Sequence, residues 1–267
     1  MKASPFVKWA GGKGQLLSQF EPYFPARFAG YVEPFLGGGA VFFHLYNRGR
    51  LAGKKVVLLD RLEELINCYR VVRDRPEALI AELRRHEPHK LDEDYYYRLR
   101  AWDRQPDYAR RGPVARAARF IFMNRTCYNG LYRVNSKGQF NVPFGRYRNP
   151  KVCDAVRLWA ASRALQGVDL LAGDFERCRE VAKAGDLVYL DPPYHPLSKT
   201  ANFTSYTAGD FDAGDQRRLA ALYRALDERG CRLMLSNSCT PFVQGLYEGF
   251  EQAQVQARRP ISARGDG

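Results

Sequence analysis

Cysteine, histidine and long apolar runs are scarce in this sequence. Its 267 residues include six cysteines and four histidines; no two cysteines have a Cys-x-x-Cys spacing, and the histidines form no cluster. The pattern argues against a disulfide framework or a structural zinc site, so we expect free thiols and no metal. No apolar run approaches the roughly 20 residues of a transmembrane helix, and residues 1–6 lack the apolar core of a signal peptide. We therefore expect a cytoplasmic protein with no membrane partner.

Acidic residues are nearly absent from one basic segment. The net charge is +13, and the 48 residues from Arg104 to Lys151 hold 11 lysines and arginines but a single acid, Asp107. The other 219 residues carry 31 basic and 28 acidic groups. Aromatic residues alternate with the arginines of this segment: Phe120, Phe122, Tyr128, Tyr132, Phe140, Phe144 and Tyr147. Because basic groups neutralise phosphates and aromatic rings stack on bases, the segment indicates a nucleic-acid partner in preference to a merely solvated basic face.

Predicted strands alternate with predicted helices along most of the chain. Short apolar runs predict strands that begin near residue 31, at 56–59, at 187–190 and at 231–238, and a strand followed by a loop at 168–175. Helical periodicity is found at 62–83, 114–122, 156–165 and 215–229. The helical pattern of 62–83 is interrupted near Pro76, and Gly, Asn and Pro in 124–150 predict loops with a hairpin near residues 136–138. This alternation is typical of an α/β sheet, with residues 62–148 inserted into it.

The stretch "DLVYLDPPY" ends a buried strand on a carboxylate. Leu187 to Leu190 form a continuous apolar run, and Pro192 and Pro193, which have no backbone N–H, cannot continue a hydrogen-bonded ladder. The chain must therefore leave the sheet at Asp191. Since ligands of open α/β sheets bind outside the carboxyl ends of the strands, we expect Asp191 and Tyr194 at the edge of a cleft.

A glycine-rich loop, "EPFLGGGAVF", follows a predicted strand and opens a predicted helix. It matches neither Gly-x-Gly-x-x-Gly nor a phosphate loop with its lysine. Asp60 ends the next strand, 21 residues past Gly39, where an acid accepts hydrogen bonds from ribose hydroxyls. A glycine loop without phosphate chemistry, followed by a ribose acid, predicts a nucleoside-type cofactor without a pyrophosphate. S-adenosylmethionine fits this description.

Six motifs in order carry a resemblance to a known family. They are "FVKWAGGKGQLL", "YVEPFLGGGAVFF", "FMNRTCYNGLYRVNSKGQFNVPFGRY", "GDF", "DPPYHPLSKTANFTSY" and "LSNSCTPF" with "VQARRPIS". The sequence resembles the DNA adenine methyltransferase (Dam) family of class alpha amino-methyltransferases, whose glycine motif comes first, the recognition region next and the Asp-Pro-Pro-Tyr motif last. The order and the nearly complete coverage of the chain make the resemblance specific.

The resemblance implies a Rossmann-like sheet that binds S-adenosylmethionine, with an inserted, mostly helical DNA-recognition domain. The catalytic domain would comprise residues 1–61 and 149–267, and the recognition domain residues 62–148. Cofactor contacts are implied at Trp9, Lys13, Glu33, Phe35, Gly37, Gly39, Asp60, Asp174, Phe175 and Asp191. The family usually has Asp-x-Asn at the ribose strand, whereas this chain has Asp60-Arg61-Leu62.

The resemblance also implies which residues contact DNA. Tyr128 and Asn129 would act near the vacated base, Arg133 and Pro143 would read the edge of the target site, and Lys8 could read an outer base. Arg125, Asn141 and Tyr147 complete the implied set. The implied partner is double-stranded DNA with a GATC site or a longer site containing GAT. A monomer is expected, and a cognate restriction endonuclease is considered as a functional, not a physical, partner.

The implied reaction is methyl transfer to N6 of an adenine that is flipped out of the duplex. Asp191 and the carbonyl of Pro192 would each accept one N6 hydrogen, with Pro193 keeping the turn rigid and the ring of Tyr194 stacking on the base. Three other functions stay open: methylation of N4 of cytosine, methylation of RNA, and DNA binding without catalysis. Methylation of C5 of cytosine is disfavoured, because the chain has no Pro-Cys dipeptide.

Overall fold

Five parallel strands form one sheet in the order β3-β2-β1-β4-β5. The strands are β1 (Tyr31–Glu33), β2 (Val56–Asp60), β3 (Asp169–Ala172), β4 (Leu187–Leu190) and β5 (Arg232–Leu235). This strand order is that of a doubly wound α/β sheet, so the predicted Rossmann-like class is confirmed. The computed structural model describes residues 1–194 and 211–256. Residues 195–206 of the Asp-Pro-Pro-Tyr motif and residues 257–262 of the last motif lie outside the described residues.

Alternating side chains of the strands enter two different hydrophobic clusters. On β2, Val56 and Leu58 belong to one cluster and Val57 to the other; on β4, Leu187 and Tyr189 are separated from Val188 and Leu190 in the same way. The first cluster contains apolar residues of the helices α2 (Ala40–Asn47), α3 (Glu63–Asp74), α6 (Pro113–Thr126) and α7 (Ala155–Leu165), and the second contains those of α8 (Cys178–Val181) and α9 (Ala213–Glu228). Burial on both faces explains why these strands are continuously apolar in sequence.

The helices associated with the sheet include those predicted at 156–165, at 215–229 and after the glycine loop, together with short helices that were not predicted. They are α1 (Leu17–Phe20), α2 (Ala40–Asn47), α7 (Ala155–Leu165), α8 (Cys178–Val181), α9 (Ala213–Glu228) and α10 (Pro241–Leu246), with 3-10 turns η1 (Lys13–Gln15), η2 (Glu21–Tyr23) and η7 (Phe175–Arg177). Side-chain caps fix several starts: Asp154 accepts from Arg157 N, Asp212 from Asp215 N and Thr240 from Val243 N.

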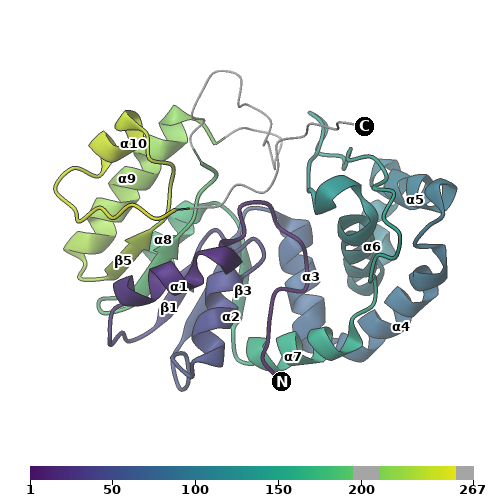
Figure 1. The fold of residues 1–267 in the computed structure, drawn as a ribbon, viewed down its shortest axis with the longest axis horizontal. Helices are drawn as coiled ribbons and strands as arrows, with labels where there is room; N and C mark the ends of the chain where they lie inside the picture. The colour runs from purple at the N-terminus through teal and green to yellow at the C-terminus, as the bar shows by residue number, and fades with distance from the viewer. Residues whose placement is uncertain (195–210, 257–267) are drawn as a thin grey trace.

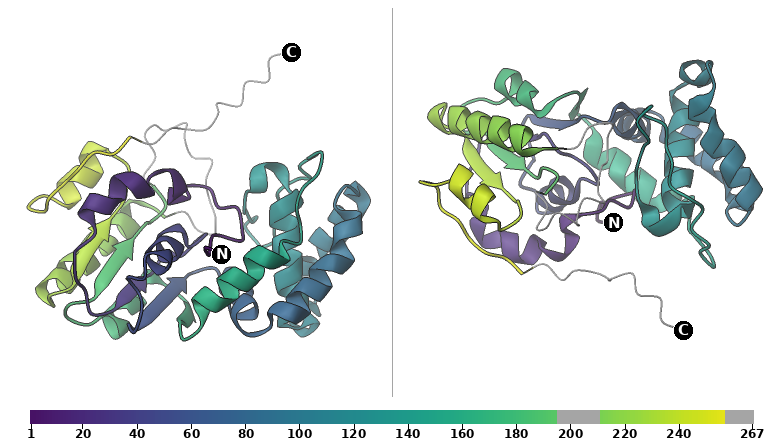
Figure 2. Two further views of the ribbon diagram at one scale, coloured as in Figure 1. Left: turned by 60° about the horizontal axis from the view of Figure 1, so that its bottom comes forward. Right: turned by 90° about the horizontal axis from the view of Figure 1, so that it is seen from above.

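A second group of helices is formed by residues 63–130, which follow β2. It contains α3 (Glu63–Asp74), α4 (Pro76–His86), α5 (Glu93–Arg100) and α6 (Pro113–Thr126), with 3-10 turns η3 (Glu87–His89), η4 (Ala101–Arg104), η5 (Tyr108–Arg111) and η6 (Tyr128–Gly130). Pro76 occupies the first turn of α4, where its missing N–H costs nothing, so the predicted interruption separates two helices. Helices α4, α5 and α6 lie together on one side of the molecule (Figures 1 and 2).

Helix α3 joins the two groups, because it contacts β2 and β3 as well as α4, α6 and α7. The apolar residues of both groups accordingly belong to one buried cluster. The predicted division of the chain at residue 62 stays a prediction.

The segment after α6 folds back as the predicted hairpin. Antiparallel bridges join Val134 to Phe140 and Cys127 to Phe144, and Asn135 N donates to Gln139 O at the turn. Gly145 N donates to Thr126 O at 2.8 Å, which ties the returning strand to the last turn of α6. The hairpin is therefore anchored at its base and not only at its turn.

No helix in residues 1–194 and 211–256 combines the length and the apolarity needed to cross a bilayer.

Replacement of Gly145 by alanine is expected to lower the free energy of unfolding by about 1–3 kcal/mol. A Cβ atom at this position would lie 2.5 Å from the carbonyl carbon of Cys127 and 2.7 Å from Tyr128 N, and both are backbone atoms that cannot rotate away. Urea unfolding of the Gly145→Ala variant measures the effect. The matched control is Gly245→Ala in α10, where no atom lies within 4 Å of the added Cβ; equal stability of the two variants would contradict the expectation.

Candidate active site

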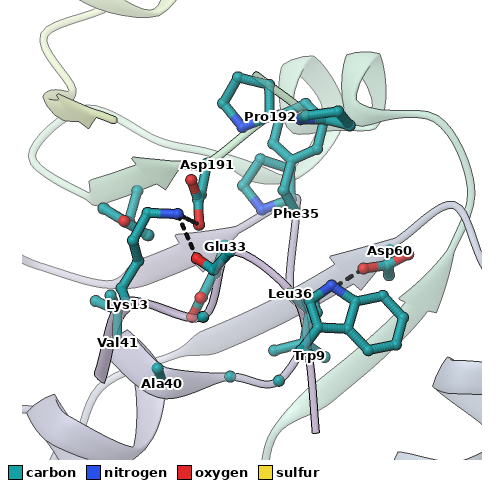
Figure 3. A pocket seen from close by; sticks show the side chains of 18 of the residues that line it. Trp9, Lys13, Glu33, Phe35, Leu36, Ala40, Val41, Asp60, Asp191 and Pro192 are labelled. Carbon is teal, nitrogen blue, oxygen red and sulfur yellow. Dashed lines mark hydrogen bonds and ion pairs between the residues drawn. The ribbon is translucent and has the colours of Figure 1, made fainter. Parts of the chain in front are cut away.

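The order in which the chain adds strands to the sheet reverses between β1 and β4, and a cavity of about 470 Å³ lies against this point. Strand β1 pairs with β2 on one side and β4 on the other, so chain connections diverge from here. Ligands of open α/β sheets bind at such a switch point, outside the carboxyl ends of the strands. Glu33 ends β1 and Asp191 directly follows β4, and both line the cavity (Figure 3).

Lys13 and Asp191 form a buried ion pair in this cavity. The Lys13 Nζ atom lies 2.6 Å from Asp191 Oδ2, and the Lys13 side chain is only 5% exposed. The ammonium also donates to Gly11 O at 2.7 Å and lies 4.7 Å from the centre of the Tyr194 ring. Burial lowers the pKa of Lys13, but attraction to Asp191 and Tyr194 outweighs it and the pKa is raised. Lys13 therefore stays protonated.

The carboxyl of Asp191 receives hydrogen bonds on both oxygens. Ser236 Oγ donates to Oδ1 at 2.8 Å, opposite the contact of Lys13 with Oδ2. Burial raises the pKa of Asp191, and both donors oppose that rise. The carboxylate is thus oriented by groups from two other parts of the chain.

Glu33 is a second carboxyl in the same cavity and is 2% exposed. Tyr31 Oη donates to Glu33 Oε2 at 2.8 Å. Burial raises the pKa of Glu33 to about 8, and the neighbouring Asp191 contributes to the rise. An acid held neutral by burial at physiological pH is available to ionise when a cation enters the cavity.

Asp60 holds the glycine loop against the end of β2. Its Oδ2 accepts from Gly37 N at 2.9 Å, and its Oδ1 accepts from Leu62 N at 2.9 Å. Burial raises the pKa of Asp60 to about 6. Leu62 stands where the family usually has asparagine, and its backbone N–H bonds the same carboxylate.

The glycine loop leaves no room for side chains. Gly37 and Gly39 have positive φ angles of 49° and 69°, and a Cβ on Gly37 would lie 2.6 Å from the indole of Trp9. That indole points toward the carboxyl of Asp60 (Figure 3). The loop therefore presents backbone to the cavity, with Trp9 packed against it.

Aromatic rings form the wall near β3. The rings of Phe35 and Phe175 stack with centroids 5.4 Å apart, and Phe211 meets Phe35 edge-on at 5.8 Å. Asp174 caps the turn at Phe175 by accepting from Glu176 N, and it pairs with Arg218 at 2.8 Å. The wall combines a flat apolar surface with a fixed acid at its edge.

Every residue predicted to act in catalysis or to contact the cofactor lines this one cavity: Trp9, Lys13, Glu33, Phe35, Gly37, Gly39, Asp60, Asp174, Phe175, Asp191, Pro192, Pro193 and Tyr194. Lys13 and Asp191, which lie 178 positions apart in sequence, make direct contact. In the described part of the chain, no group of three or more His, Cys, Asp or Glu side chains could hold a metal ion.

The residues predicted to contact DNA gather around the hairpin instead. Tyr128 N donates to Pro143 O at 2.9 Å, so the "YNGLYR" and "FNVPFG" segments lie side by side. Arg133 is exposed, and its Nε donates to Asn141 Oδ1 at 2.7 Å. Asn129 is exposed with a φ of 54°, which asparagine tolerates better than most residues.

Lys8 connects this hairpin to the first segment of the chain. Its Nζ lies 4.0 Å from the centre of the Tyr147 ring, and its backbone N and O bond the side chain of Asn124 at 2.7 and 2.8 Å. Arg125 is only partly exposed and donates to Phe6 O. Arg125 therefore makes a hydrogen bond within the protein that the sequence did not predict.

Four polar residues were not predicted individually, three beside the Asp-Pro-Pro-Tyr turn and one beside the hairpin. Ser236 contacts Asp191, Asn237 bonds the buried Gln216, and Asn124 joins Lys8 to Gly130 O. Ser236 and Asn237 belong to the family motif "LSNSCTPF" and to the predicted strand 231–238, but neither signal assigned them a contact. Strand order, which no local pattern reveals, decides that this strand is the neighbour of β4.

Residues 9–261 match the family described as D12 class N6 adenine-specific DNA methyltransferase. The chain is 49% identical to the Type II methyltransferase M.MjaIII of Methanocaldococcus jannaschii, covering 100% of this chain and 95% of that protein. It is 45% identical to the Type II methyltransferase M1.LlaDCHI of Lactococcus lactis subsp. cremoris, with coverage of 97% and 90%. Identity to the DNA adenine methylase of Escherichia coli is 34%, with coverage of 99% and 91%.

Glu33→Gln is expected to stabilise the cofactor-free protein at pH 8. In the unfolded chain Glu33 ionises above its ordinary pKa of 4.5, whereas the folded protein keeps the proton to about pH 8. Unfolding between these two pKa values therefore releases a proton, and the free energy of unfolding of the wild type falls as the pH rises from 5 to 8. At pH 7 the loss, relative to a protein whose Glu33 has the same pKa in both states, is roughly 3 kcal/mol. The glutamine side chain keeps an oxygen that can accept from Tyr31, but it has no proton that is released on unfolding.

The measurement is thermal unfolding of both proteins at pH 5 and pH 8. The variant should gain stability over the wild type as the pH rises. Glu228→Gln, at the exposed end of α9, is the control. Parallel pH dependence of the Glu33→Gln variant and the wild type would disprove the assignment of a neutral Glu33.

Proposed function

This chain belongs to the family of D12 class N6 adenine-specific DNA methyltransferases, and we propose that it transfers a methyl group from S-adenosylmethionine to adenine N6 in a short site of double-stranded DNA. GATC, or a longer site containing GAT, is the proposed target. The observation that carries the proposal is the convergence of Asp191, Tyr194 and Glu33 on one cavity at the switch point of the sheet.

The residues around the cavity fit S-adenosylmethionine, which is a cation with an adenosine and an amino-acid end. Buried acids suit the cationic groups, and Asp60 at the end of β2 suits a ribose. The stacked Phe35 and Phe175 offer a surface for the adenine, and the glycine loop lets the ligand approach the backbone closely. Trp9, Lys13, Gly37, Gly39 and Asp174 complete the proposed contacts. When bound, the sulfonium makes the methyl group electrophilic.

The chain's own groups would then activate the target amine. Adenine N6 is a poor nucleophile because its lone pair is delocalised into the ring. Asp191 would accept a hydrogen bond from one N6 hydrogen and the carbonyl of Pro192 from the other, so that the nitrogen becomes pyramidal as charge develops. As the bond from N6 to the methyl group forms and the bond from the methyl group to sulfur breaks, neutral S-adenosylhomocysteine would leave and the methylated nitrogen would lose one proton to solvent. Pro193 keeps the turn rigid. Because Lys13 already holds Asp191 Oδ2 and Ser236 holds Oδ1, the acceptor is oriented before the base arrives.

The target base would have to leave the duplex, at a cost of a few kcal/mol. The Tyr194 ring is 43% exposed and lies at the cavity. Stacking on such a ring contributes about 1–3 kcal/mol per base, which offsets much of the cost. Tyr128, which is 48% exposed, and Asn129 would occupy the space that the base vacates.

Recognition is proposed for the segment 62–148. Arg133 would read a guanine with its terminal nitrogens, because its Nε is already used by Asn141. Pro143 would contact the same edge of the site, and Lys8 would read an outer base. The remaining proposed DNA contacts are Arg125, Asn141 and Tyr147.

The proposed enzyme acts as a monomer in the cytoplasm, where its DNA substrate lies. The names of two relatives as Type II methyltransferases support a restriction endonuclease of the same site specificity as a functional partner.

The proposal is tested with labelled S-adenosylmethionine and two duplexes, one with a single GATC and one with the same bases scrambled. Label on adenine N6 in the first duplex alone is expected from the wild type. Asp191→Ala should abolish transfer, because it removes the acceptor for the N6 hydrogen and the partner of Lys13. Duplex binding should stay within a few-fold, because the change lies in the cavity and not among the exposed residues proposed to contact DNA. Near-normal turnover by this variant would refute the proposed mechanism, and label on adenines of duplexes without GAT would refute the proposed site.

Arg133→Ala should weaken discrimination at one base pair by about 1–3 kcal/mol. The measurement compares transfer to the cognate duplex with transfer to duplexes changed at one position each. Arg133→Lys keeps the charge but loses the planar fork, so it should resemble alanine if the contact is bidentate. An equal loss on every duplex would identify Arg133 as a phosphate contact.

A further inference from the structure

The residues after β5 lie beside the Asp-Pro-Pro-Tyr turn because of strand register. Leu190 of β4 pairs with Leu235 of β5. Asp191 and Ser236 are the residues that directly follow this pair on the two strands. Ser236 N extends the ladder by donating to Leu190 O at 2.9 Å. The side chain of Ser236 is thereby placed to donate to Asp191 Oδ1 at 2.8 Å.

A buried phenol fixes the direction of this hydrogen bond. Tyr189 Oη lies 3.0 Å from Ser236 Oγ, and Tyr189 is 1% exposed. A carboxylate can only accept, so the single Ser236 proton is directed to Asp191 and the Tyr189 hydroxyl donates to Ser236. Burial raises the pKa of Tyr189 well above its usual value of 10, so the phenol keeps its proton. Tyr189, Ser236 and Asp191 form one line of hydrogen bonds.

A second line reaches the other end of the turn. Gln216 of α9 is fully buried, and its Nε2 donates to Pro193 O at 3.1 Å. Its Oε1 accepts from Asn237 Nδ2 at 2.9 Å. Asn237 follows Ser236 directly, so two successive residues after β5 hold the carboxylate and, through Gln216, the carbonyl of Pro193.

We propose that Ser236, Asn237 and Gln216 are positioning residues that orient the two hydrogen acceptors of the Asp-Pro-Pro-Tyr turn toward the target amine. This inference rests on the proposed function. Ser236 fixes the plane of the Asp191 carboxylate by holding Oδ1. The bond from Gln216 to Pro193 O fixes the peptide next to the Pro192 carbonyl, and the rigid φ of proline transmits that constraint to the carbonyl. None of the three needs to touch the methyl group.

The charge state of Asp191 distinguishes the line of hydrogen bonds through Ser236 from the line through Gln216. Ionised Asp191 is the stronger acceptor of a hydrogen bond from the amine, and the Ser236 hydrogen bond favours the ionised form. Among residues 1–194 and 211–256, the titratable groups that interact with this carboxyl are Lys13 from η1, Tyr31 and Glu33 from β1, Tyr189 from β4, and Tyr194. Loss of the Ser236 hydroxyl should raise the pKa of Asp191, whereas loss of the Gln216 amide should leave that pKa unchanged.

The test is the single-turnover rate of methyl transfer to the cognate duplex as a function of pH. Ser236→Ala should lower the maximal rate about 10- to 100-fold, as expected for a misoriented reacting group, and should move the acid limb to higher pH. Dissociation constants for S-adenosylmethionine and for the duplex should stay within a few-fold of the wild type. Ser236→Thr keeps the hydroxyl and should restore both the rate and the acid limb.

Two further variants make the result independent of the folding of Ser236→Ala. Tyr189→Phe removes only the outer hydroxyl, so it should produce a smaller loss and a shift of the acid limb in the same direction. Gln216→Met keeps the volume of the buried side chain, so it should lower the rate without moving the acid limb. Thermal unfolding of each variant confirms that the native protein is being measured.

An unchanged rate and pH profile in Ser236→Ala, with an active wild type, would overturn the inference and leave the proposed function intact. A rate loss without a shift of the acid limb in Ser236→Ala would equally overturn the role assigned to the hydroxyl. A wild type that transfers no methyl group overturns both the proposed function and this inference.

Discussion

The ion pair between Lys13 and Asp191 is the interaction on which the geometry of the site depends. It joins the first turn of the chain to the end of β4, and its atoms are 2.6 Å apart in a largely buried cavity. A buried carboxylate without such a partner would be costly, because desolvation is repaid only by close and well-aligned donors. Lys13 supplies the charge and Ser236 a neutral donor. These two donors oppose the rise that burial causes in the pKa of Asp191, and the proton of the second acid, Glu33, lowers the local repulsion.

The segment from Phe6 to Lys13 links the cavity to the hairpin that is proposed to bind DNA. Lys13 reaches Asp191, Trp9 packs on the glycine loop at Gly37, and Lys8 is held by Asn124 at the end of α6. The ring of Trp9 also stacks on Tyr132 of the hairpin, with centroids 6.1 Å apart. One short segment thus contacts both the proposed cofactor site and the proposed recognition site, so neither can shift far without displacing the other.

Local patterns predicted the elements whose residues are buried in regular fashion. The apolar run 187–190 became β4 with those bounds, and Pro76 separated α3 from α4 as expected. The cavity residues were predicted largely through family motifs, which carry information that a single sequence does not. Ser236 and Gln216 could not be predicted, because their contacts depend on the register of β4 with β5 and on how α9 packs. Arg125 was predicted only as a DNA contact, and its bond to Phe6 O needed the three-dimensional structure.

The long separations within the site have a consequence for synthesis on the ribosome. Lys13 is made early, but its partner Asp191 comes 178 residues later, and Ser236 later still. Contacts this distant in sequence close slowly, after the local helices have formed. The site proposed for methyl transfer can assemble only when β5 has left the exit tunnel and joined the sheet. A nascent chain in which β5 has not yet paired with β4 would therefore lack the oriented Asp191 carboxylate, and methyl transfer would have to await that pairing.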